Sequence, residues 1–175
     1  TASVQTISAH LKQMELQDKM PDMLIVDYAD ILKPMGNFTE RRHQLGNIYE
    51  DLRGMAGEYE IPVWTASQAN RSALEEDIID ASKISESYGK VMVADFVLSL
   101  SRKVQDKLSG TGRWHVIKNR FGQDGITFPS KMNASNGQII IHTPDSLDGQ
   151  DVQKDMDNHS EYLRKVLKSK YNKEA

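Results

Sequence analysis

The sequence predicts an α/β fold, in which helices flank a sheet with a parallel core and an antiparallel C-terminal edge. Two short apolar runs, 23–26 and 61–66, show no alternation of polar and apolar residues. That pattern is typical of parallel strands buried on both faces. A long amphipathic helix is predicted between them, over residues 40–59. Several strand-like segments follow from residue 96, and this order of elements favours one sheet of mixed direction.

The helices are predicted from apolar residues at helical spacing. The first covers roughly residues 3–19 and ends before Pro21, which cannot continue a helix. Its apolar positions are Val4, Ile7, Leu11 and Met14. The helix over 40–59 has the same pattern at Leu45, Ile48, Leu52, Met55, Ala56 and Tyr59. Both patterns are those of helices that bury one face.

The second half of the chain is predicted to consist mainly of strands. The polar stretch 69–90 is expected to be a long loop with short helical turns, and a Gly-containing turn is expected at 109–112. The expected strands cover 96–100, 114–118, 125–128 and 138–142. Residues 1–143 would then form one incomplete domain. Residues 144–175 are expected to form a flexible linker, rich in Asp, Gly and Gln over 144–158, and a short basic terminal helix.

Composition excludes several kinds of protein and site. The chain has no cysteine, which excludes disulfides and thiolate metal sites. Its five histidines are scattered without metal-ligand spacing. No apolar run approaches the roughly 18 residues that a membrane span needs, and no membrane partner is expected. The net charge of −3 is uneven, because residues 1–89 carry −7 and residues 90–131 carry +5. That basic segment suits a contact with phosphates, and equally suits a solvated charged surface.

Distinctive polar residues follow three of the predicted strands, and ligands of parallel α/β sheets bind at the carboxyl ends of strands. Asp27 follows the first strand, in the position of a residue that organises Mg²⁺ beside nucleotide phosphates. Gln68 follows the second, where a neutral amide can sense a γ-phosphate. Lys118 and Arg120 leave a later strand, as a pair of cations able to stabilise a transferring phosphoryl group. Taken alone, Asp27 could equally cap the following turn. A glutamine in the position of Gln68 is more commonly a loop cap, and Lys118 with Arg120 could equally belong to a basic turn in solvent.

Taken in order, these segments resemble the ATPase domain of DnaB-type hexameric replicative helicases, which have the RecA fold, and most of all those of large tailed phages. Met23-Leu24-Ile25-Val26-Asp27-Tyr28 resembles the Walker B strand, and Trp64-Thr65-Ala66-Ser67-Gln68 resembles the sensor strand. Ile84-Ser85-Glu86-Ser87 through Ala94-Asp95 resembles a central DNA-contacting loop and the return to the sheet. Lys118-Asn119-Arg120-Phe121-Gly122 resembles the family's Lys-x-Arg-x-Gly element. The likeness covers roughly residues 1–142.

The resemblance implies an ATP-dependent motor that acts on single-stranded DNA with ATP and Mg²⁺ as cofactors. Asp27 would organise the Mg²⁺, and Gln68 would couple the γ-phosphate to the DNA loop. Lys118 and Arg120 would reach the nucleotide of a neighbouring subunit, with Arg120 as an arginine finger. Glu86, Gly89 and Lys90 would contact DNA, with Lys90 meeting a phosphate. The implied partners are a homo-hexameric ring, a primase and a helicase loader, in a bacterial or phage-infected cytoplasm.

Two departures from the family pattern limit what the resemblance implies. Many bacterial relatives have Arg before the glutamate of the DNA loop, whereas this chain has Ser85. No Gly-x-x-x-x-Gly-Lys-Ser/Thr motif occurs in the sequence, and the family's P-loop and catalytic glutamate lie upstream of the matched segment. Without backbone amides to hold the phosphates, this chain by itself is not expected to hydrolyse ATP. A RecA-like recombinase or regulatory ATPase, and a non-catalytic DNA- or ring-partner-binding module, remain alternative interpretations.

Overall fold

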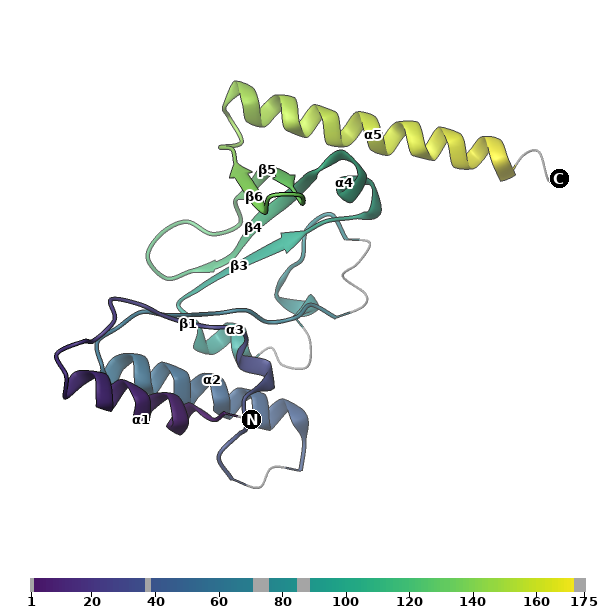
Figure 1. Cartoon of the computed structure of the whole chain (residues 1–175). Helices are drawn as coiled ribbons and strands as arrows, with labels where there is room; N and C mark the ends of the chain where they lie inside the picture. Colours follow the sequence, from purple (N-terminus) through teal and green to yellow (C-terminus); the bar gives the residue numbers. More distant parts are fainter. Residues whose placement is uncertain (1, 37–38, 71–75, 85–88, 172–175) are drawn as a thin grey trace. The chain divides into compact units, whose positions relative to one another are not determined.

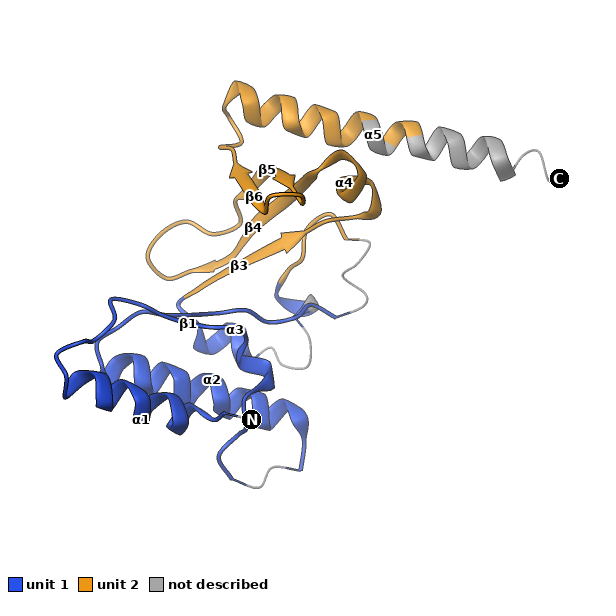
Figure 2. Ribbon diagram, viewed as in Figure 1, with its two compact units in different colours: residues 1–70, 81–95 blue, residues 71–80, 96–175 orange. Residues whose placement is uncertain are grey.

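The computed structural model describes residues 2–36, 39–70, 76–84 and 89–171 (Figure 1). The chain divides into two compact units (Figure 2). Unit 1 contains residues 1–70 and 81–95, and unit 2 contains residues 71–80 and 96–175. Each unit has its own sheet. No helix of the described residues is both long and apolar enough to cross a membrane.

Unit 1 is built on two parallel strands, β1 (Leu24–Val26) and β2 (Val63–Thr65), paired in the register Val26↔Thr65. Helices α1 (Val4–Glu15) and α2 (Arg41–Glu58) lie side by side (Figure 1), and their apolar residues form a core with the inward side chains of the strands. These two helices confirm the predictions made from helical spacing. Three shorter helices also belong to the described part of unit 1: η1 (Ala29–Ile31), η3 (Ala81–Lys83) and α3 (Gly89–Val93).

The start of α1 shows why the helix begins where it does. Ser3 caps it, because the Ser3 hydroxyl accepts a hydrogen bond from the backbone N–H of Thr6 over 3.3 Å. The Thr6 hydroxyl accepts in turn from the Ser3 N–H, which completes a reciprocal cap. Within the core of the unit, Leu45 and Ile48 of α2 are almost completely buried, with 1% and 0% of their surfaces exposed.

The predicted burial of both faces of the parallel strands is wrong for the described chain. Leu24 and Val26 face the core, whereas Ile25 between them is 72% exposed. Ile25 pairs in register with Trp64 of β2, which is 48% exposed. Side chains alternate between the two faces of a strand, and the helices of unit 1 pack on one of those faces. An uninterrupted apolar run therefore leaves its alternate residues at the surface.

Unit 2 is built on a four-stranded antiparallel sheet in the order β3-β4-β5-β6. These strands are β3 (Phe96–Ser101), β4 (Thr111–Asn119), β5 (Thr127–Asn133) and β6 (Gln138–Ile141). The prediction of an antiparallel C-terminal set of strands is confirmed. The prediction of one continuous sheet is wrong for the described residues, because their strands form two hydrogen-bonded sheets.

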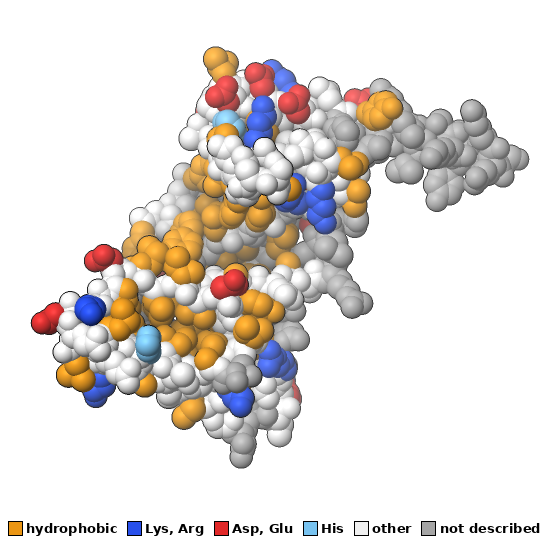
Figure 3. All heavy atoms as spheres, viewed as in Figure 1, with side chains coloured by type: hydrophobic (Ala, Val, Ile, Leu, Met, Phe, Trp, Pro, Cys, Tyr) orange, Lys and Arg blue, Asp and Glu red, His pale blue; other side chains and the backbone are white. Residues whose placement is uncertain are grey.

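Two helices of unit 2 correct the sequence predictions. Helix α4 (Val104–Ser109) lies almost wholly between the expected strand at 96–100 and the expected turn at 109–112, where the sequence predicts no element. It ends at Gly110, whose φ of 68° requires the left-handed region that glycine tolerates. Helix α5 (Leu147–Tyr171) begins within the expected flexible linker. It packs by Val152 and Met156, which are 0% and 1% exposed. Acidic and basic side chains are interspersed on the solvent side of its first half (Figure 3).

Helix α4 is joined to β4 by a buried ion pair. Arg113 Nη1 donates to Asp106 Oδ2 over 2.8 Å, and both side chains are less than 9% exposed. Asp106 also accepts from the backbone N–H of Lys103 and from the hydroxyl of Thr111. A buried carboxylate is tolerated when its charge is paired and its oxygens accept hydrogen bonds, as these do. The local sequence of α4 is polar, so its position depends on these tertiary contacts.

Candidate functional site

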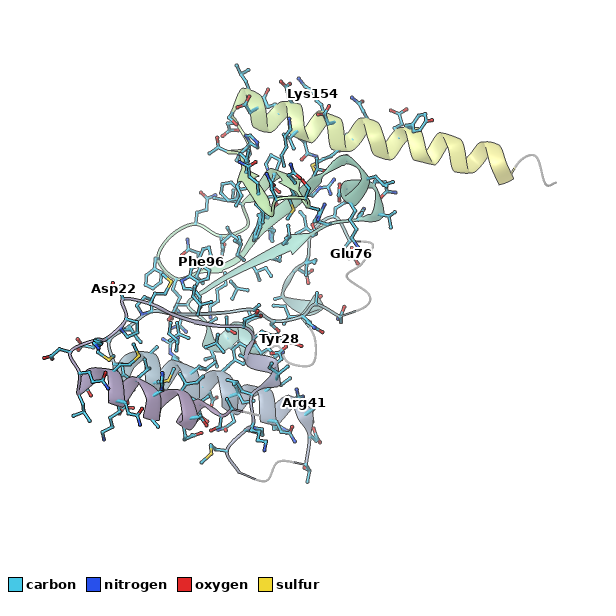
Figure 4. The ribbon with its side chains drawn as sticks, viewed as in Figure 1. Asp22, Tyr28, Arg41, Glu76, Phe96 and Lys154 are labelled. Carbon is cyan, nitrogen blue, oxygen red and sulfur yellow. The ribbon has the colours of Figure 1, made fainter. Side chains whose placement is uncertain are left out.

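The carboxyl ends of β1 and β2 meet at one edge of the parallel sheet. Asp27 directly follows β1, Gln68 lies three residues beyond β2, and both side chains are exposed. The side-chain amide of Gln68 donates a hydrogen bond to the hydroxyl of Tyr28 over 3.2 Å. Tyr28 comes from the turn after β1 (Figure 4). The structure therefore brings together the two strand ends on which the Asp27 and Gln68 predictions rest.

Thr65, the last residue of β2, holds the turn that carries Asp27. Its hydroxyl donates to the carbonyl of Val26 over 2.8 Å and accepts from the backbone N–H of Ala29 over 2.9 Å. These two bonds span the peptide units on either side of Asp27 and Tyr28, whose shared peptide bond is cis. A single side chain thus fixes the backbone of the neighbouring strand end, and the exposed Asp27 carboxylate projects from a positioned turn.

A largely buried polar network lies behind these strand ends and centres on Asp30. One carboxylate oxygen of Asp30 accepts from Lys90 Nζ over 2.9 Å and from the hydroxyl of Ser67 over 3.0 Å. The other accepts from the hydroxyl of Tyr49 over 2.9 Å. Lys90 Nζ also donates to the Ser67 hydroxyl over 3.0 Å. The network joins η1, α2, α3 and the end of β2, and its four side chains satisfy one another's hydrogen bonds.

The electrostatics of this network favour a neutral phenol at Tyr49. Burial raises the pKa of Tyr49 well above its ordinary value, and the adjacent Asp30 carboxylate raises it further. Lys90 Nζ lies 5.6 Å from the centroid of the Tyr49 ring, within the range of a cation–π contact. Arg41, at the start of α2 (Figure 4), donates to the backbone carbonyl of Asp30. Two cations thus surround the segment that carries the Asp30 carboxylate.

The position of Lys90 differs from the prediction that its ammonium contacts a DNA phosphate. The residue is 3% exposed and its charge is paired with Asp30, so it presents no cation to solvent in this structure. The reason is local, since Lys90 is the second residue of α3 and faces the core rather than the preceding loop. Gly89 is the first residue of α3 and is half-buried. Glu86, the third predicted DNA contact, lies outside the described residues.

Lys118 and Arg120 belong to unit 2, at the end of β4. Lys118 pairs with Val97 of β3, and Arg120 is the exposed first residue beyond the strand. Asn119 between them shapes the turn. Its side-chain oxygen accepts from the N–H of Phe121 over 3.0 Å, and its side-chain nitrogen donates to the carbonyl of Gln123 over 3.2 Å. An asparagine that bonds its own backbone in this way fixes a turn, so Arg120 is presented on an ordered loop.

The chemistry of Asp27 fits one part of a magnesium–nucleotide site. Mg²⁺ is usually held by one or two carboxylates together with phosphate oxygens and water, and Asp27 offers one exposed carboxylate on a fixed turn. In the described part of the chain, no group of three or more His, Cys, Asp or Glu side chains is arranged to hold a metal by itself. Asp27 therefore suits a Mg²⁺ ion that arrives already bound to nucleotide phosphates.

Sequence reasoning missed the residues that support the site. Asp30, Ser67 and Tyr49 are buried or lie beside the predicted residues, yet the sequence pattern assigns none of them a role. A usable signal exists for Asp30, because it is a second acid, three residues after Asp27, in the otherwise largely apolar segment 23–32. Its partner Lys90 is 60 positions away, and no local pattern could have identified that contact.

Comparison with known proteins supports the resemblance found in the sequence. The family described as the DnaB-like helicase C-terminal domain matches residues 1–133. A DnaB-like replicative helicase of Enterobacteria phage T4 is 30% identical over 125 residues, which cover 69% of this chain and 26% of the relative. The replicative DNA helicase DnaB of Helicobacter pylori strain 26695 is 31% identical over 103 residues, which cover 57% of this chain and 21% of the relative. The chain thus spans about a quarter of the length of these curated relatives.

Two solved structures share the fold. One is a DnaB-like replicative helicase studied with its interactions with primase, with a TM-score of 0.69 over 79% of this chain and 36% of that one. The other is an ATPase domain, with a TM-score of 0.68 over 79% of this chain and 51% of that one. Both are 24% identical, a level at which the comparison shows the RecA-like helicase ATPase fold and not a shared activity. By the match over residues 1–133, the chain belongs to the family of DnaB-like helicase C-terminal domains.

Proposed function

We propose that this chain is the C-terminal portion of the motor of an ATP-dependent replicative DNA helicase. In the complete protein, ATP hydrolysis would drive translocation along single-stranded DNA and unwinding of the duplex. The observation that carries the proposal is the Gln68–Tyr28 hydrogen bond across the ends of β1 and β2. It ties an amide suited to sensing a γ-phosphate to the residue next to Asp27. Membership in a helicase family favours this function over that of a recombinase or regulatory ATPase.

In this proposal the chain's own residues bind and orient the ligands of the motor, which are Mg²⁺, nucleotide phosphates and DNA. Asp27 holds the Mg²⁺ that accompanies ATP, and that ion supplies charge neutralisation at the phosphates. The Gln68 amide nitrogen carries two N–H donors, of which one donates to Tyr28 in this structure and the other can donate toward phosphate oxygen. The side-chain amide carries no net charge, so it brings no competing cation to the phosphates. Residues 85–89 contact single-stranded DNA, chiefly by backbone groups, and buried Lys90 is not assigned to that contact.

Lys118 and Arg120 are proposed to act in trans. The ordered turn around Asn119 places Arg120 at the surface immediately after β4, where it can enter the nucleotide site of a neighbouring subunit in a hexameric ring. An arginine in that role stabilises transition-state charge and contributes roughly 10³- to 10⁵-fold in rate. A primase and a helicase loader are proposed as further partners, in a bacterial or phage-infected cytoplasm.

The phosphate-cradling P-loop would be supplied by the rest of the ATPase domain. The 175-residue chain contains no Gly-x-x-x-x-Gly-Lys-Ser/Thr sequence. A helix N-terminus with glycine-rich backbone amides is the usual anchor for the phosphates of a nucleotide. We therefore expect the chain alone to show no ATPase activity, with or without single-stranded DNA.

The test uses mixed rings of the full-length protein. Arg120→Ala rings are expected to bind nucleotide but to lose DNA-stimulated hydrolysis, whereas the matched variant Arg42→Ala, another exposed arginine, should keep it. Mixing Arg120→Ala subunits with Asp27→Asn subunits should restore part of the activity. At some interfaces an intact Asp27 then meets an intact Arg120 from the neighbour. Active homogeneous Arg120→Ala rings, or mixtures no more active than their components, would contradict a trans-acting arginine.

A further inference from the structure

Strand β6 is one edge of the four-stranded sheet of unit 2, and its apolar side chains are exposed. Ile139, Ile140 and Ile141 are 44%, 45% and 49% exposed, and among the described residues β6 pairs with β5 alone. Proteins usually protect such an edge with a charged residue, a proline or a bulge, because an unpaired strand recruits others. The strand Gln138–Ile141 has no charged residue and no proline, and its pairing with β5 shows no register shift.

The backbone of β6 directs two residues toward the open edge. The N–H of His142 donates to the carbonyl of Pro129 over 2.9 Å, which makes these two a hydrogen-bonded pair of the antiparallel ladder. Such pairs alternate with pairs that are not hydrogen-bonded, so Ile140 directs its backbone groups toward β5. Ile139 and Ile141 therefore direct their N–H groups and carbonyls outward, where an added strand can bond to them.

A cationic groove lies beside this edge, between α4 and the hairpin of β5 and β6. Its volume is about 500 Å³, and its charged lining consists of Arg102, Lys107 and Lys131, with no acidic side chain. Neither of the two lysines forms an ion pair with another described residue. Leu108, which is 70% exposed, adds apolar surface to the same groove. Cations beside apolar surface favour a ligand that carries both acidic and apolar groups.

The alternation of side chains determines which extended segment would fit. Lys131 pairs in register with Ile140, so both lie on the groove face of the hairpin, whereas Ile139 and Ile141 lie on the other face. Neighbouring strands are about 4.8 Å apart, so Lys131 would be roughly 10 Å from an added strand, a distance that extended lysine and glutamate side chains span together. Acidic residues therefore suit the groove-facing positions of that strand, and apolar residues suit the positions beside Ile139 and Ile141.

The composition of β6 argues against a second copy of this chain as the occupant of the edge. The strand contains glutamine and isoleucine and no acid, so a neighbouring β6 would bring no negative charge to the groove. A nucleic acid would satisfy the cations with phosphates, but it would leave the outward N–H groups and the three isoleucines without matching partners. An extended peptide satisfies all of these groups, because strand addition provides main-chain hydrogen bonds and alternating side-chain contacts.

We propose that β6 and the cationic groove bind an extended segment of a partner protein, in which acidic and apolar residues alternate, as an additional strand of the sheet. Main-chain bonds to Ile139 and Ile141 hold the segment, and the cations select its acidic residues. Strand β6 lies beyond residue 133, where the family match ends. The surface requires neither nucleotide nor DNA, so the interaction is separate from the proposed motor function and is tested separately.

The experiment measures binding of a fluorescein-labelled peptide of alternating Glu and Val to the full-length protein by fluorescence anisotropy. We expect saturable binding that weakens as the salt concentration rises, because the cations of the groove are accessible to solvent. Lys131→Glu places like charges together and is expected to weaken binding by at least about tenfold. The matched variant Lys154→Glu changes another exposed lysine of unit 2, outside the groove, and should keep the wild-type affinity.

Methylated peptides test strand pairing without any change to the protein. One peptide carries N-methyl groups on its Glu residues and another carries them on its Val residues. Alternate N–H groups of a strand point to opposite edges, so only one of these two peptides should fail to bind. Hydrogen–deuterium exchange of residues 138–142 should be fast in the protein alone and should slow when the unmethylated peptide binds.

Several outcomes would overturn the proposal. Absence of peptide binding, unchanged affinity in Lys131→Glu, or equal binding of a peptide of alternating Lys and Val would remove the charge selection on which it rests. Equal effects of the two methylated peptides would exclude an added strand. Slow exchange of 138–142 in the protein alone would show an edge already covered, by a second copy if the protection depends on protein concentration and by the rest of the full-length chain if it does not.

Discussion

The side-chain amide of Gln68 donates a hydrogen bond to the hydroxyl of Tyr28 across the ends of two parallel strands, over 3.2 Å. The bond fixes which way an exposed amide points before any ligand arrives. Its donor follows β2 and its acceptor follows β1, so each strand end constrains the other. The first prediction tests the contribution of this arrangement to a nucleotide sensor.

Tyr28→Phe removes the acceptor and leaves the ring in place. A typical hydrogen bond contributes about 1 kcal/mol net, or roughly fivefold in an equilibrium constant. We expect DNA-stimulated kcat in the full-length protein to fall by about that factor, because Gln68 then samples more rotamers. Gln68→Ala should fall further, since the sensing amide itself is lost. Steady-state ATPase assays measure both, and equal effects of the two variants would argue that Tyr28 has a role of its own.

The raised pKa of Tyr49 predicts how stability depends on alkaline pH. In the unfolded chain this phenol titrates near its ordinary pKa of about 10, whereas in the fold burial and Asp30 keep it protonated to higher pH. The unfolded state therefore loses a proton first, and the free energy of unfolding falls as pH rises above about 10. Tyr49 contributes up to roughly 1.4 kcal/mol per pH unit to this fall in the free energy of unfolding. Below that pH, Tyr49 contributes no pH dependence.

Tyr49→Phe isolates this contribution in urea denaturation at a series of pH values. The variant loses the bond to Asp30 and is expected to be less stable at neutral pH. Its free energy of unfolding should fall less steeply above pH 10 than that of the wild type. Other tyrosines and lysines titrate in both proteins, so only the difference between the two curves is informative. Parallel curves would show that the phenol is not held neutral by the fold.

The Asp106–Arg113 pair predicts an asymmetric response to mutation in unit 2. Asp106→Asn removes the buried partner of the Arg113 guanidinium and leaves it the exposed Asp77 carboxylate at 3.7 Å, and breaking a buried pair in this way typically costs about 3–5 kcal/mol. The double variant Asp106→Leu/Arg113→Met removes both charges and should recover much of that loss. Lys154→Ala in the exposed pair with Asp151 serves as the control, with a change below about 0.5 kcal/mol. Chemical denaturation of all three measures the free energies of unfolding.

Two helical glycines predict opposite effects of the same substitution. A Cβ at Gly149 would clash with the carbonyl oxygen of Thr143 at the start of α5, so Gly149→Ala should destabilise the protein. Gly54 lies inside α2 in open space, with nothing within 4 Å of the position that a Cβ would take. Gly54→Ala should therefore stabilise by about 0.5–1 kcal/mol. Melting temperatures of the two variants compare the effects directly. A stabilising Gly149→Ala would mean that α5 does not begin where the structure places it.

The sequence predicts the elements whose local pattern and tertiary environment agree. Both helices of unit 1 are predictable because apolar residues such as Leu45 and Ile48 recur at the spacing that their burial requires. Asp27 and Gln68 can be paired because parallel strands place their carboxyl ends together. Lys118 and Arg120 are recognisable in the sequence as two cations that leave a strand. The turn that presents Arg120 depends on Asn119, which a search for charged residues does not identify.

The elements that sequence reasoning misses depend on distant contacts. Helix α4 is polar and short, and its buried Asp106 is explained only by Arg113 on the next strand. Helix α5 begins in a segment whose composition suggests a linker, although Ser146 caps it by accepting from the N–H of Gly149 over 3.0 Å. Among the α5 residues whose burial the structure describes, Val152 and Met156 make the buried contact, and two apolar positions within the polar stretch 148–158 give little periodic signal.

The solvent-exposed pair of Ile25 and Trp64 gives the protein an intrinsic fluorescence reporter. Trp64 is one of two tryptophans, and with 48% of its surface exposed its indole is open to water and to quenchers such as iodide. Trp114, the other, is half-buried in β4. Any assembly that covers the outer face of the parallel strands should shift the emission of Trp64 to shorter wavelength and protect it from quenching. Trp64, whose exposure differs from the predicted burial of both strand faces, thus allows assembly to be followed by intrinsic fluorescence, without a label.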